Sequence, residues 1–452
     1  MATRRQFIQS AIYAGGATLA ATTTARAQDA AATPSAPVGT PAPATQSKND
    51  RPGLAVIGAG GMATFHGQFL PKYGDVVAVC DVDRRHADKY NAGVAGGKAF
   101  VTARHEEVLS RDDVDAIFVC APDHWHAKIA ADALRAGKDV YCEKPMTLTI
   151  DEGRFLCDVT RQTGRIVQVG TQQRSEDQFP TAIALAQAGR LGKIRKVTVV
   201  IGDTPKGVDL KTAPVPAELD WDRWLGQAPL VDYIPERSHS TFRWWYEYSG
   251  GRITDWGAHH VDIAQSAVAP DLPGPMVIEP VSVHHPVPLQ HGMPTVANAF
   301  NTADKFHVKC TFANGVEMTI HDVLEGFGAD NGILIEGDAG SLFVNRLKLT
   351  GAAVDQMKEN PLPEGAIPAL PKDIVQGHDR HIANFIECCR TRTTPRSDVW
   401  THHRNLTTCH LANIALRVGR PIKWDASAQQ IVGDEEANAL QARPQRKGYE
   451  IA

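Results

Sequence analysis

The 452-residue sequence lacks the patterns that would place it in a specialised class of protein. Its eight cysteines contain no Cys-x-x-Cys pair, so neither a zinc ribbon nor a disulfide framework is indicated. The formal net charge of −4 provides no basic surface for nucleic acid. No apolar run of about 18 uncharged residues follows the N-terminal segment, so no membrane-spanning helix is predicted in the mature chain. What remains is an ordinary globular composition, long enough for two domains.

The N-terminal segment 1–27 is predicted to be an export signal and not part of the fold. Arg4-Arg5 precedes a mildly apolar run, and Ala25-Arg26-Ala27 supplies small residues at a cleavage site. This pattern resembles a twin-arginine signal, which would export the folded protein to the periplasm. Residues 28–50 are rich in Ala, Pro, Thr and Ser and are predicted to form a disordered linker.

A glycine-rich turn follows the first apolar run of the predicted domain. Residues Leu54–Ile57 lead into Gly58-x-Gly60-x-x-Ala63, and the sequence after the turn is compatible with a helix. This strand–turn–helix pattern is typical of a dinucleotide site, where Gly58 permits the turn and Gly60 lets the backbone approach a pyrophosphate. The first turn of the helix would offer its N–H groups and dipole to the phosphates. Unrelated turns also use such glycines, so the motif needs further support.

That support comes from the second predicted strand, 76–80, which ends at Asp81. An acid about 20 residues past the glycines lies where the ribose hydroxyl partner of an NAD site belongs. Arg84 and Arg85 follow closely and could instead hold a 2′-phosphate, which leaves NADP open. NAD is favoured because a carboxylate at the strand end repels a phosphate.

Further strands are predicted at 116–120, 139–142 and 165–170, alternating with helical segments. This order predicts an α/β fold with a parallel, doubly wound sheet. Ligands of such sheets bind beyond the carboxyl ends of the strands. The predicted cofactor-binding residues are Gly58, Gly60, Gly61, Met62, Asp81, Pro122, His124, Glu143 and Lys144.

The stretch Cys142-Glu-Lys-Pro-Met146 resembles the signature of the Gfo/Idh/MocA family, named after glucose–fructose oxidoreductase, inositol dehydrogenase and a rhizopine catabolism protein. Residues 121–126 (Ala-Pro-Asp-His-Trp-His) and 136–140 (Ala-Gly-Lys-Asp-Val) strengthen the resemblance. It implies a Rossmann domain followed by an α+β domain, whose mainly antiparallel open sheet would support a homo-oligomer, a dimer or tetramer. It also implies that Lys144 contacts cofactor and substrate hydroxyl, where an ammonium would stabilise a developing alkoxide.

The second half contains strand-like runs without intervening helices, which also predicts an antiparallel sheet. Asn314-Gly315 is a hairpin signal between two of them. Near the end of the chain, residues 399–418 are predicted to form a helix with Ser397 as the N-cap and Gly419 as the stop. The predicted domain limits are 51–174, 175–424 and a loosely held polar tail at 425–452. The predicted strands cover 194–201, 277–284, 306–312, 316–321, 333–336 and 341–344.

A candidate acid–base pair lies in the segment 249–262. Asp255 and His259 are four residues apart, so on a helix they share one face. A carboxylate beside an imidazole raises its basicity and fixes its tautomer, which makes His259 a usable general base. The pair resembles the Asp-x-x-x-His pair of the family. The predicted catalytic set is Lys144, Asp255 and His259.

Five of the eight tryptophans fall within residues 221–256. Aromatic faces suit the C–H faces of sugars, although tryptophans more often belong to a core. Arg174 and His260 are further candidates, for which a surface and a structural position remain equally open. The predicted substrate-binding residues are Lys144, Arg174, Trp245, Trp256, His259 and His260.

The resemblance implies an exported, NAD(P)-dependent oxidoreductase that converts a secondary hydroxyl of a sugar or polyol to a ketone. Free NAD is scarce outside the cytoplasm, so the cofactor is expected to be tightly bound. A redox-neutral NAD-dependent glycosidase or lyase is one alternative, although related glycosidases carry a different helix motif. A non-catalytic sugar-binding member is another, disfavoured by the retained catalytic residues.

No metal site is predicted, because hydride transfer needs no metal ion. Several potential ligands are present, but their spacing in the sequence fixes no tetrahedral set. These residues are His124, His126, His259, His260 and Asp262.

Overall fold

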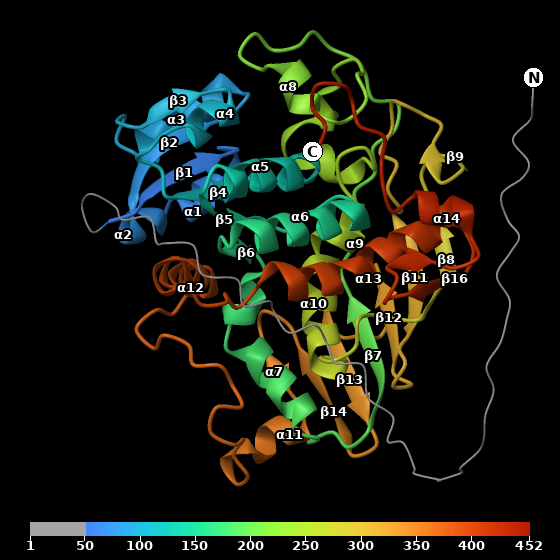
Figure 1. Ribbon diagram of the computed structural model, residues 1–452. Coiled ribbons are helices and arrows are strands. Elements are labelled where there is room, and N and C mark those ends of the chain that lie inside the picture. Colours follow the sequence, from blue (N-terminus) through green and yellow to red (C-terminus); the bar gives the residue numbers. More distant parts are fainter. Residues whose placement is uncertain (1–50) are drawn as a thin grey trace, which may run out of the picture. The chain divides into compact units, whose positions relative to one another are not determined.

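The computed structural model describes residues 51–452, which form two large sheets, a small two-stranded sheet and the helices around them (Figure 1). The predicted export signal and linker lie outside the described residues. Within residues 51–452, no helix is both long and apolar enough to cross a membrane.

The first sheet is parallel throughout, with the strand order β3-β2-β1-β4-β5-β6. All five residues of β1 are buried, as expected for a strand covered on both faces by helices. This confirms the predicted doubly wound sheet. The strands are β1 (Gly53–Ile57), β2 (Asp75–Cys80), β3 (Phe100–Thr102), β4 (Ala116–Val119), β5 (Asp139–Cys142) and β6 (Val167–Val169). The helices between them are α1 (Gly61–His66), α2 (Leu70–Tyr73), α3 (Arg84–Val94), α4 (His105–Leu109), α5 (Asp123–Arg135) and α6 (Ile150–Thr163).

The second sheet has nine strands in the order β15-β14-β13-β7-β12-β11-β8-β16-β17. Only the β7–β12 pair is parallel, so the predicted mainly antiparallel sheet is confirmed. The predicted Asn314-Gly315 turn joins β11 to β12, with Gly315 in the left-handed region (φ 82°). The strands are β7 (Ile194–Val200), β8 (Val277–His284), β11 (Lys305–Thr311), β12 (Glu317–His321), β13 (Gly332–Gly337), β14 (Gly340–Val344), β15 (Leu349–Thr350), β16 (Ile422–Asp425) and β17 (Gln430–Ile431).

Helices α10 and α13 pack against one another and against the second sheet, and α13 also contacts α6 of the first domain. The predicted bounds of α13 are confirmed, but its N-cap is Asp398 and not Ser397. The Asp398 side chain accepts the N–H groups of Trp400 and Thr401, while Ser397 is buried against Thr171. The larger helices of this half are α7 (Gln178–Gln187), α10 (Gly257–Val268), α12 (Gly377–Thr391) and α13 (Val399–Val418). Shorter elements are α8 (Trp221–Leu225), α9 (Gly251–Asp255), α11 (Ala352–Asp355), α14 (Glu435–Ala439), β9 (Leu289–Gln290), β10 (Met293–Pro294) and the 3₁₀ turns η1 (Gln172–Ser175), η2 (Pro235–Arg237), η3 (His239–Trp244) and η4 (Gln356–Lys358).

The C-terminal segment packs on the domain, contrary to the prediction of a loosely held tail. Arg443 forms an ion pair with Glu152 of α6 at 2.6 Å and donates to the backbone carbonyl of His124 at 2.8 Å. Arg446 donates to the carbonyl of Gly226. The charged side chains of this segment suggest exposure to solvent when only the sequence is considered. Their partners cannot be recognised there, because they lie far away along the chain.

Candidate active site and cofactor pocket

The glycine turn between β1 and α1 has room for a ligand. Gly58 has a left-handed backbone (φ 88°), and a Cβ atom there would lie 2.4 Å from the backbone nitrogen of Ala121. A Cβ at Gly60 or Gly61 would meet no atom within 4 Å. Both glycines and Met62 line a large pocket beside the turn. The turn therefore combines the tight backbone and the open approach that a pyrophosphate requires.

Asp81 at the end of β2 fixes the glycine turn to the second strand. Its Oδ2 accepts the backbone N–H of Ala59 at 2.7 Å, and the side chain lines the same pocket. The two following arginines are engaged elsewhere, Arg84 with Asp88 and Arg85 with Asp83. A carboxylate and not an unpaired guanidinium therefore lies where the ribose hydroxyls bind, which fits NAD better than NADP.

Residues of the second half of the chain form one side of the pocket. Its volume of about 410 Å³ is in the range of small-molecule sites. Pro122, Glu143 and Lys144 line the side formed by the first domain. The opposite side is lined by α8 and by residues 235–244, which comprise η2 and η3 and are called the η2–η3 loop. The lining residues are Arg223, Trp224, His239, Ser240, Phe242 and Arg243.

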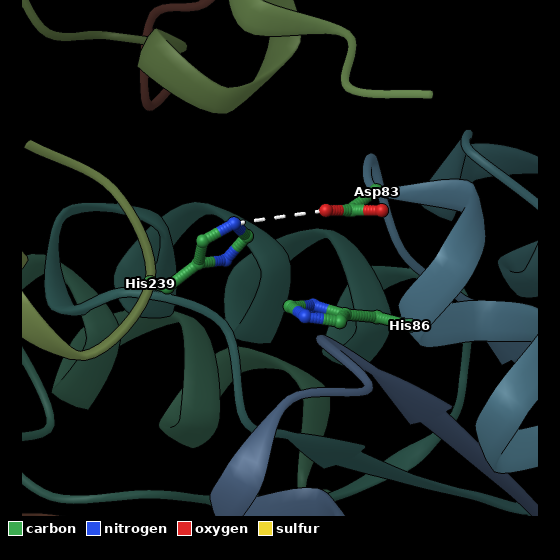
Figure 2. A group of neighbouring side chains, drawn as sticks. All are labelled: Asp83, His86 and His239. Atoms are coloured by element: carbon green, nitrogen blue, oxygen red, sulfur yellow. Dashed lines mark ion pairs between the residues drawn. The ribbon is translucent and has the colours of Figure 1, made fainter. Parts of the chain in front are cut away.

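Three side chains meet where the η2–η3 loop reaches α3 (Figure 2). His239 Nε2 lies 3.6 Å from Asp83 Oδ2, and the rings of His239 and His86 are 4.7 Å apart. Their potential ligand atoms all lie within 4.8 Å of one another, so they could hold a divalent cation. However, Arg85 already pairs with Asp83, and the three side chains line the cofactor pocket. The three side chains form the contact between the loop and α3.

Lys144 follows β5 and reaches α9 in the second half of the chain. Its Nζ donates to Asp255 Oδ1 at 2.6 Å and to the backbone carbonyl of Asp255 at 3.2 Å. Only 9% of the Lys144 side chain is exposed, and it lines the cofactor pocket. Two of the three predicted catalytic residues are therefore in direct contact, although 111 positions separate them in the sequence.

The carboxylate of Asp255 lies among three cations. Arg243 Nε is 3.2 Å from Oδ1, and Arg252 Nη1 is 3.9 Å from Oδ2, in addition to the Lys144 contact. Burial by itself would raise the pKa of the Asp255 carboxyl, but Lys144, Arg243 and Arg252 together hold it well below its usual range. The cations are not held by Asp255 alone, because Asp123 and Glu143 also attract Arg243, and Asp203 attracts Arg252.

The sequence predicted that Asp255 would contact His259, and the structure directs Asp255 to Lys144 instead. Trp256 separates α9 from α10, and the carboxylate turns toward the cations across the cleft. His259 Nδ1 is buried without a hydrogen-bond partner among the described residues. Burial, followed by the charges of Lys144 and Arg346, lowers the pKa of His259 well below 6.5. The imidazole is therefore neutral at pH 7, as a proton acceptor must be.

Glu143 anchors the strand end that carries Lys144. Its Oε1 lies 2.7 Å from His66 Nε2 of α1, and both side chains are buried. Gly170 packs against the carboxylate so closely that a Cβ atom there would come within 2.6 Å of Oε1. Burial raises the pKa of Glu143, but the contacts with His66 and Lys144 outweigh burial and lower it.

Seven of the predicted site residues do not line the pocket. Asp255 contacts Lys144, and Trp256, His259 and His260 lie at the start of α10. The other three have partners of their own. Arg174 donates to the carboxylate of Asp262, a buried residue of α10, at 2.7 Å. Trp245 is fully buried in an aromatic cluster. His124 is also fully buried, and its Nε2 lies 2.9 Å from the backbone carbonyl oxygen of Trp224. Their predicted roles in binding are not tested by these positions, but each side chain already has a packing role.

Trp256 and His260 lie at the start of α10, beside His259. His260 is fully buried, with Nε2 3.1 Å from Asn331 Oδ1. Trp256 is half-buried, and the guanidinium of Arg346 covers its ring at 4.7 Å. Sequence analysis did not identify Arg346, because no motif surrounds it and it reaches the site only through the turn between β14 and β15.

His378 is a second residue of this region that the sequence did not assign to the site. It lies in the first turn of α12, and its ring is 6.3 Å from that of His66. Burial lowers the pKa of His378 to about 4, against the opposing effect of Glu143. The sequence places His378 and His381 close together, but it does not indicate that α12 packs near His259. We call the part of the site that contains Lys144, Asp255 and His259 the catalytic end.

Two family models match the chain, and together they cover most of the described residues. One describes the NAD-binding Rossmann fold of an oxidoreductase family and matches residues 53–171. The other describes the C-terminal alpha/beta domain of the same family and matches residues 203–451. Both are models of Gfo/Idh/MocA proteins.

Individual relatives are more distant. The chain is 23% identical to the scyllo-inositol 2-dehydrogenase (NAD(+)) of Bacillus subtilis over 319 residues, which is 71% of this chain and 80% of that protein. It is 26% identical to an inositol 2-dehydrogenase of Rhizobium meliloti over 214 residues, 47% of this chain and 53% of that protein.

Solved structures show the same fold at lower identity. The WlbA dehydrogenase of Chromobacterium violaceum, in complex with NADH and UDP-GlcNAcA, has a TM-score of 0.62 at 19% identity and covers 86% of this chain and 99% of its own. The aldose-aldose oxidoreductase of Caulobacter crescentus has a TM-score of 0.59 at 18% identity, with coverages of 82% and 99%. The chain belongs to the Gfo/Idh/MocA family of oxidoreductases and binds NAD through its Rossmann domain.

Proposed function

We propose that the protein oxidises a secondary hydroxyl of a sugar or polyol to a ketone, with NAD⁺ as hydride acceptor. The observation that carries this proposal is the buried Lys144 ammonium, which lines the cofactor pocket and contacts Asp255 across the cleft. An ammonium held in this position donates to the substrate oxygen and stabilises negative charge that develops there. The inositol dehydrogenases among the relatives act on polyols and support this substrate class.

The residues of the chain supply the proton transfer. His259 is neutral at pH 7 and can accept the hydroxyl proton, while Lys144 holds the oxygen. Asp255 and Arg243 fix the position of the ammonium. Bound NAD⁺ supplies the hydride acceptor, and the glycine turn and Asp81 are the residues that would hold its pyrophosphate and ribose.

The alternatives make different demands on the same site. A redox-neutral glycosidase or lyase would return the hydride to its substrate, so it would leave no net NADH. A non-catalytic sugar-binding protein would not need a buried lysine beside a buried neutral histidine, and burying both costs free energy. The retained pair therefore favours the dehydrogenase.

We further propose that the protein is exported in folded form with NAD already bound. The twin-arginine pattern at the N-terminus supports export, and the closure of the pocket by α8 and the η2–η3 loop supports retention of the nucleotide. Purified protein should then release stoichiometric nucleotide on denaturation after extensive dialysis. Nucleotide-free protein would contradict retention.

The function is tested by reduction of NAD⁺ with a panel of sugars and polyols, followed by absorbance. Lys144→Met is expected to lower kcat by about 100-fold or more, since a positioned proton donor contributes about 10²–10⁴-fold. Lys305→Met is the matched control, because this half-exposed lysine pairs with Asp203 and Asp322 and does not line the pocket. Unchanged turnover in Lys144→Met would contradict the catalytic role of Lys144. Product formation without NADH would favour the redox-neutral alternative.

A further inference from the structure

Arg346 is a partly buried cation at the catalytic end that has no carboxylate partner within residues 51–452. With the amides of Gln172 and Gln173 oriented to satisfy their neighbours, its Nη2 donates to Gln172 at 3.0 Å and its Nε to Gln173 at 3.1 Å. Its guanidinium covers the ring of Trp256 at 4.7 Å. All of these contacting partners are neutral, so the guanidinium is held in place without a carboxylate in contact with it.

The same two glutamines connect Arg346 to the catalytic residues. The Gln172 amide also donates to the carbonyl of Gly170, the residue that packs against Glu143. The Gln173 amide donates to the backbone carbonyl of His259 at 3.1 Å. The guanidinium is thereby fixed between the strand end that carries Lys144 and the helix that carries His259.

The acids nearest to Arg346 act on it without an ion-pair contact. Burial lowers the pKa of Arg346, and the charges of Glu176 and Asp255 oppose this effect. Asp255 is already shared by Lys144 and Arg243. A buried cation without an anion is unfavourable, and a bound anion would remove this cost.

We propose that Arg346 binds a carboxylate of the substrate, so that the substrate is a sugar acid such as a uronate and not a neutral sugar. This inference rests on the proposed function, since it places the oxidised hydroxyl beside Lys144 and His259. A guanidinium presents two parallel N–H groups to a carboxylate, and this geometry gives specificity as well as affinity.

The carboxylate takes no part in the chemical step. The C–H bond of the secondary alcohol gives its hydride to NAD⁺, and the O–H proton goes to His259. A ketone and NADH form, and the carboxylate remains unchanged against Arg346.

The test compares each sugar acid with its neutral counterpart, glucuronate with glucose and galacturonate with galactose, in the presence of added NAD⁺. The intact protein should show a kcat/KM for the acid at least about 10-fold above that for the neutral sugar. Arg346→Met should lower the value for the acid by about 100-fold, mainly through KM, and change that for the neutral sugar by less than about 3-fold. Arg346→Lys keeps the positive charge but lacks the planar guanidinium with its paired N–H donors, so it should recover part of the loss.

Arg195→Met is the matched control, because Arg195 is an exposed arginine paired with Asp338. Equal kcat/KM values for acid and neutral sugar in the intact protein, or equal losses for both in Arg346→Met, overturn the inference and leave the proposed function standing. Failure of every sugar to reduce NAD⁺ overturns the proposed function. In that case, calorimetric titration with glucuronate tests whether Arg346 binds a carboxylate. Binding to the intact protein that is lost in Arg346→Met supports the carboxylate site, and absence of binding to the intact protein overturns it.

Discussion

The residues of the catalytic end differ in how their charges are compensated. Asp255 is surrounded by cations and stays ionised, while His259 is buried near cations and stays neutral. Both effects depend on Lys144, which pairs with one residue and lowers the pKa of the other. A general base at neutral pH must be unprotonated, and this arrangement keeps His259 in that form.

The pH dependence of turnover should therefore extend unusually far to the acid side. The pKa of a histidine in the unfolded chain is about 6.5, and the pKa of His259 in the folded protein lies below this value. Lowering the pH past 6.5 should leave kcat/KM unchanged until the lower folded pKa is reached, where protonation removes the base. The profile of kcat/KM against pH measures this directly.

His259→Asn should abolish the acid limb and lower kcat/KM by about 100-fold or more. His284→Asn is the control, because His284 is an exposed histidine beside Asp304. An acid limb centred at or above pH 6.5, or one that persists in His259→Asn, would show that another group is the base.

Among the structural elements, the η2–η3 loop lines the cofactor pocket together with Asp83 and His86. His239 of this loop has a left-handed backbone (φ 54°) and reaches Asp83 and His86 on the first domain. His239→Asn should keep this backbone, because asparagine tolerates the left-handed region, and should remove the ring contact. NAD should dissociate about 5- to 10-fold faster, since a loop with fewer contacts opens more often.

Stopped-flow release of NADH, followed by its fluorescence, measures this rate. His291→Asn provides a matched control, because His291 is also left-handed (φ 50°) but is exposed beside Glu436. Equal release rates in both variants and the intact protein would mean that the loop does not retain the nucleotide.

Local patterns predicted the elements much better than the contacts between them. The predicted strand 277–284 coincides with β8, and the helix 399–418 with α13, because apolar periodicity and caps are encoded within each segment. The short motif around Lys144 identified that residue. The Lys144–Asp255 contact and the place of Arg346 depend on tertiary packing, which no spacing in the sequence expresses.

On the scale of the whole molecule, the last ten residues join the two domains above the cofactor pocket. Arg443 binds α6 and the start of α5, whereas Arg446 and Tyr449 contact Asp222 of α8. Tyr449 also packs edge to face on Trp125, which lines the pocket together with residues of α8. This segment therefore holds α8 against the cofactor pocket, and it does not contact Lys144, Asp255 or His259.

Removal of residues 443–452 should consequently weaken NAD binding without changing the chemical step. We expect KM for NAD⁺ to rise about 10-fold and the melting temperature to fall, because the buried Arg443–Glu152 pair is lost. The value of kcat at saturating NAD⁺ should stay within about 3-fold, since other elements form the Lys144–Asp255 contact. Arg420→Ala, which breaks a partly exposed ion pair with Asp434, should change neither constant. A truncated protein that loses kcat while KM stays constant would show that the segment supports catalysis and not cofactor retention.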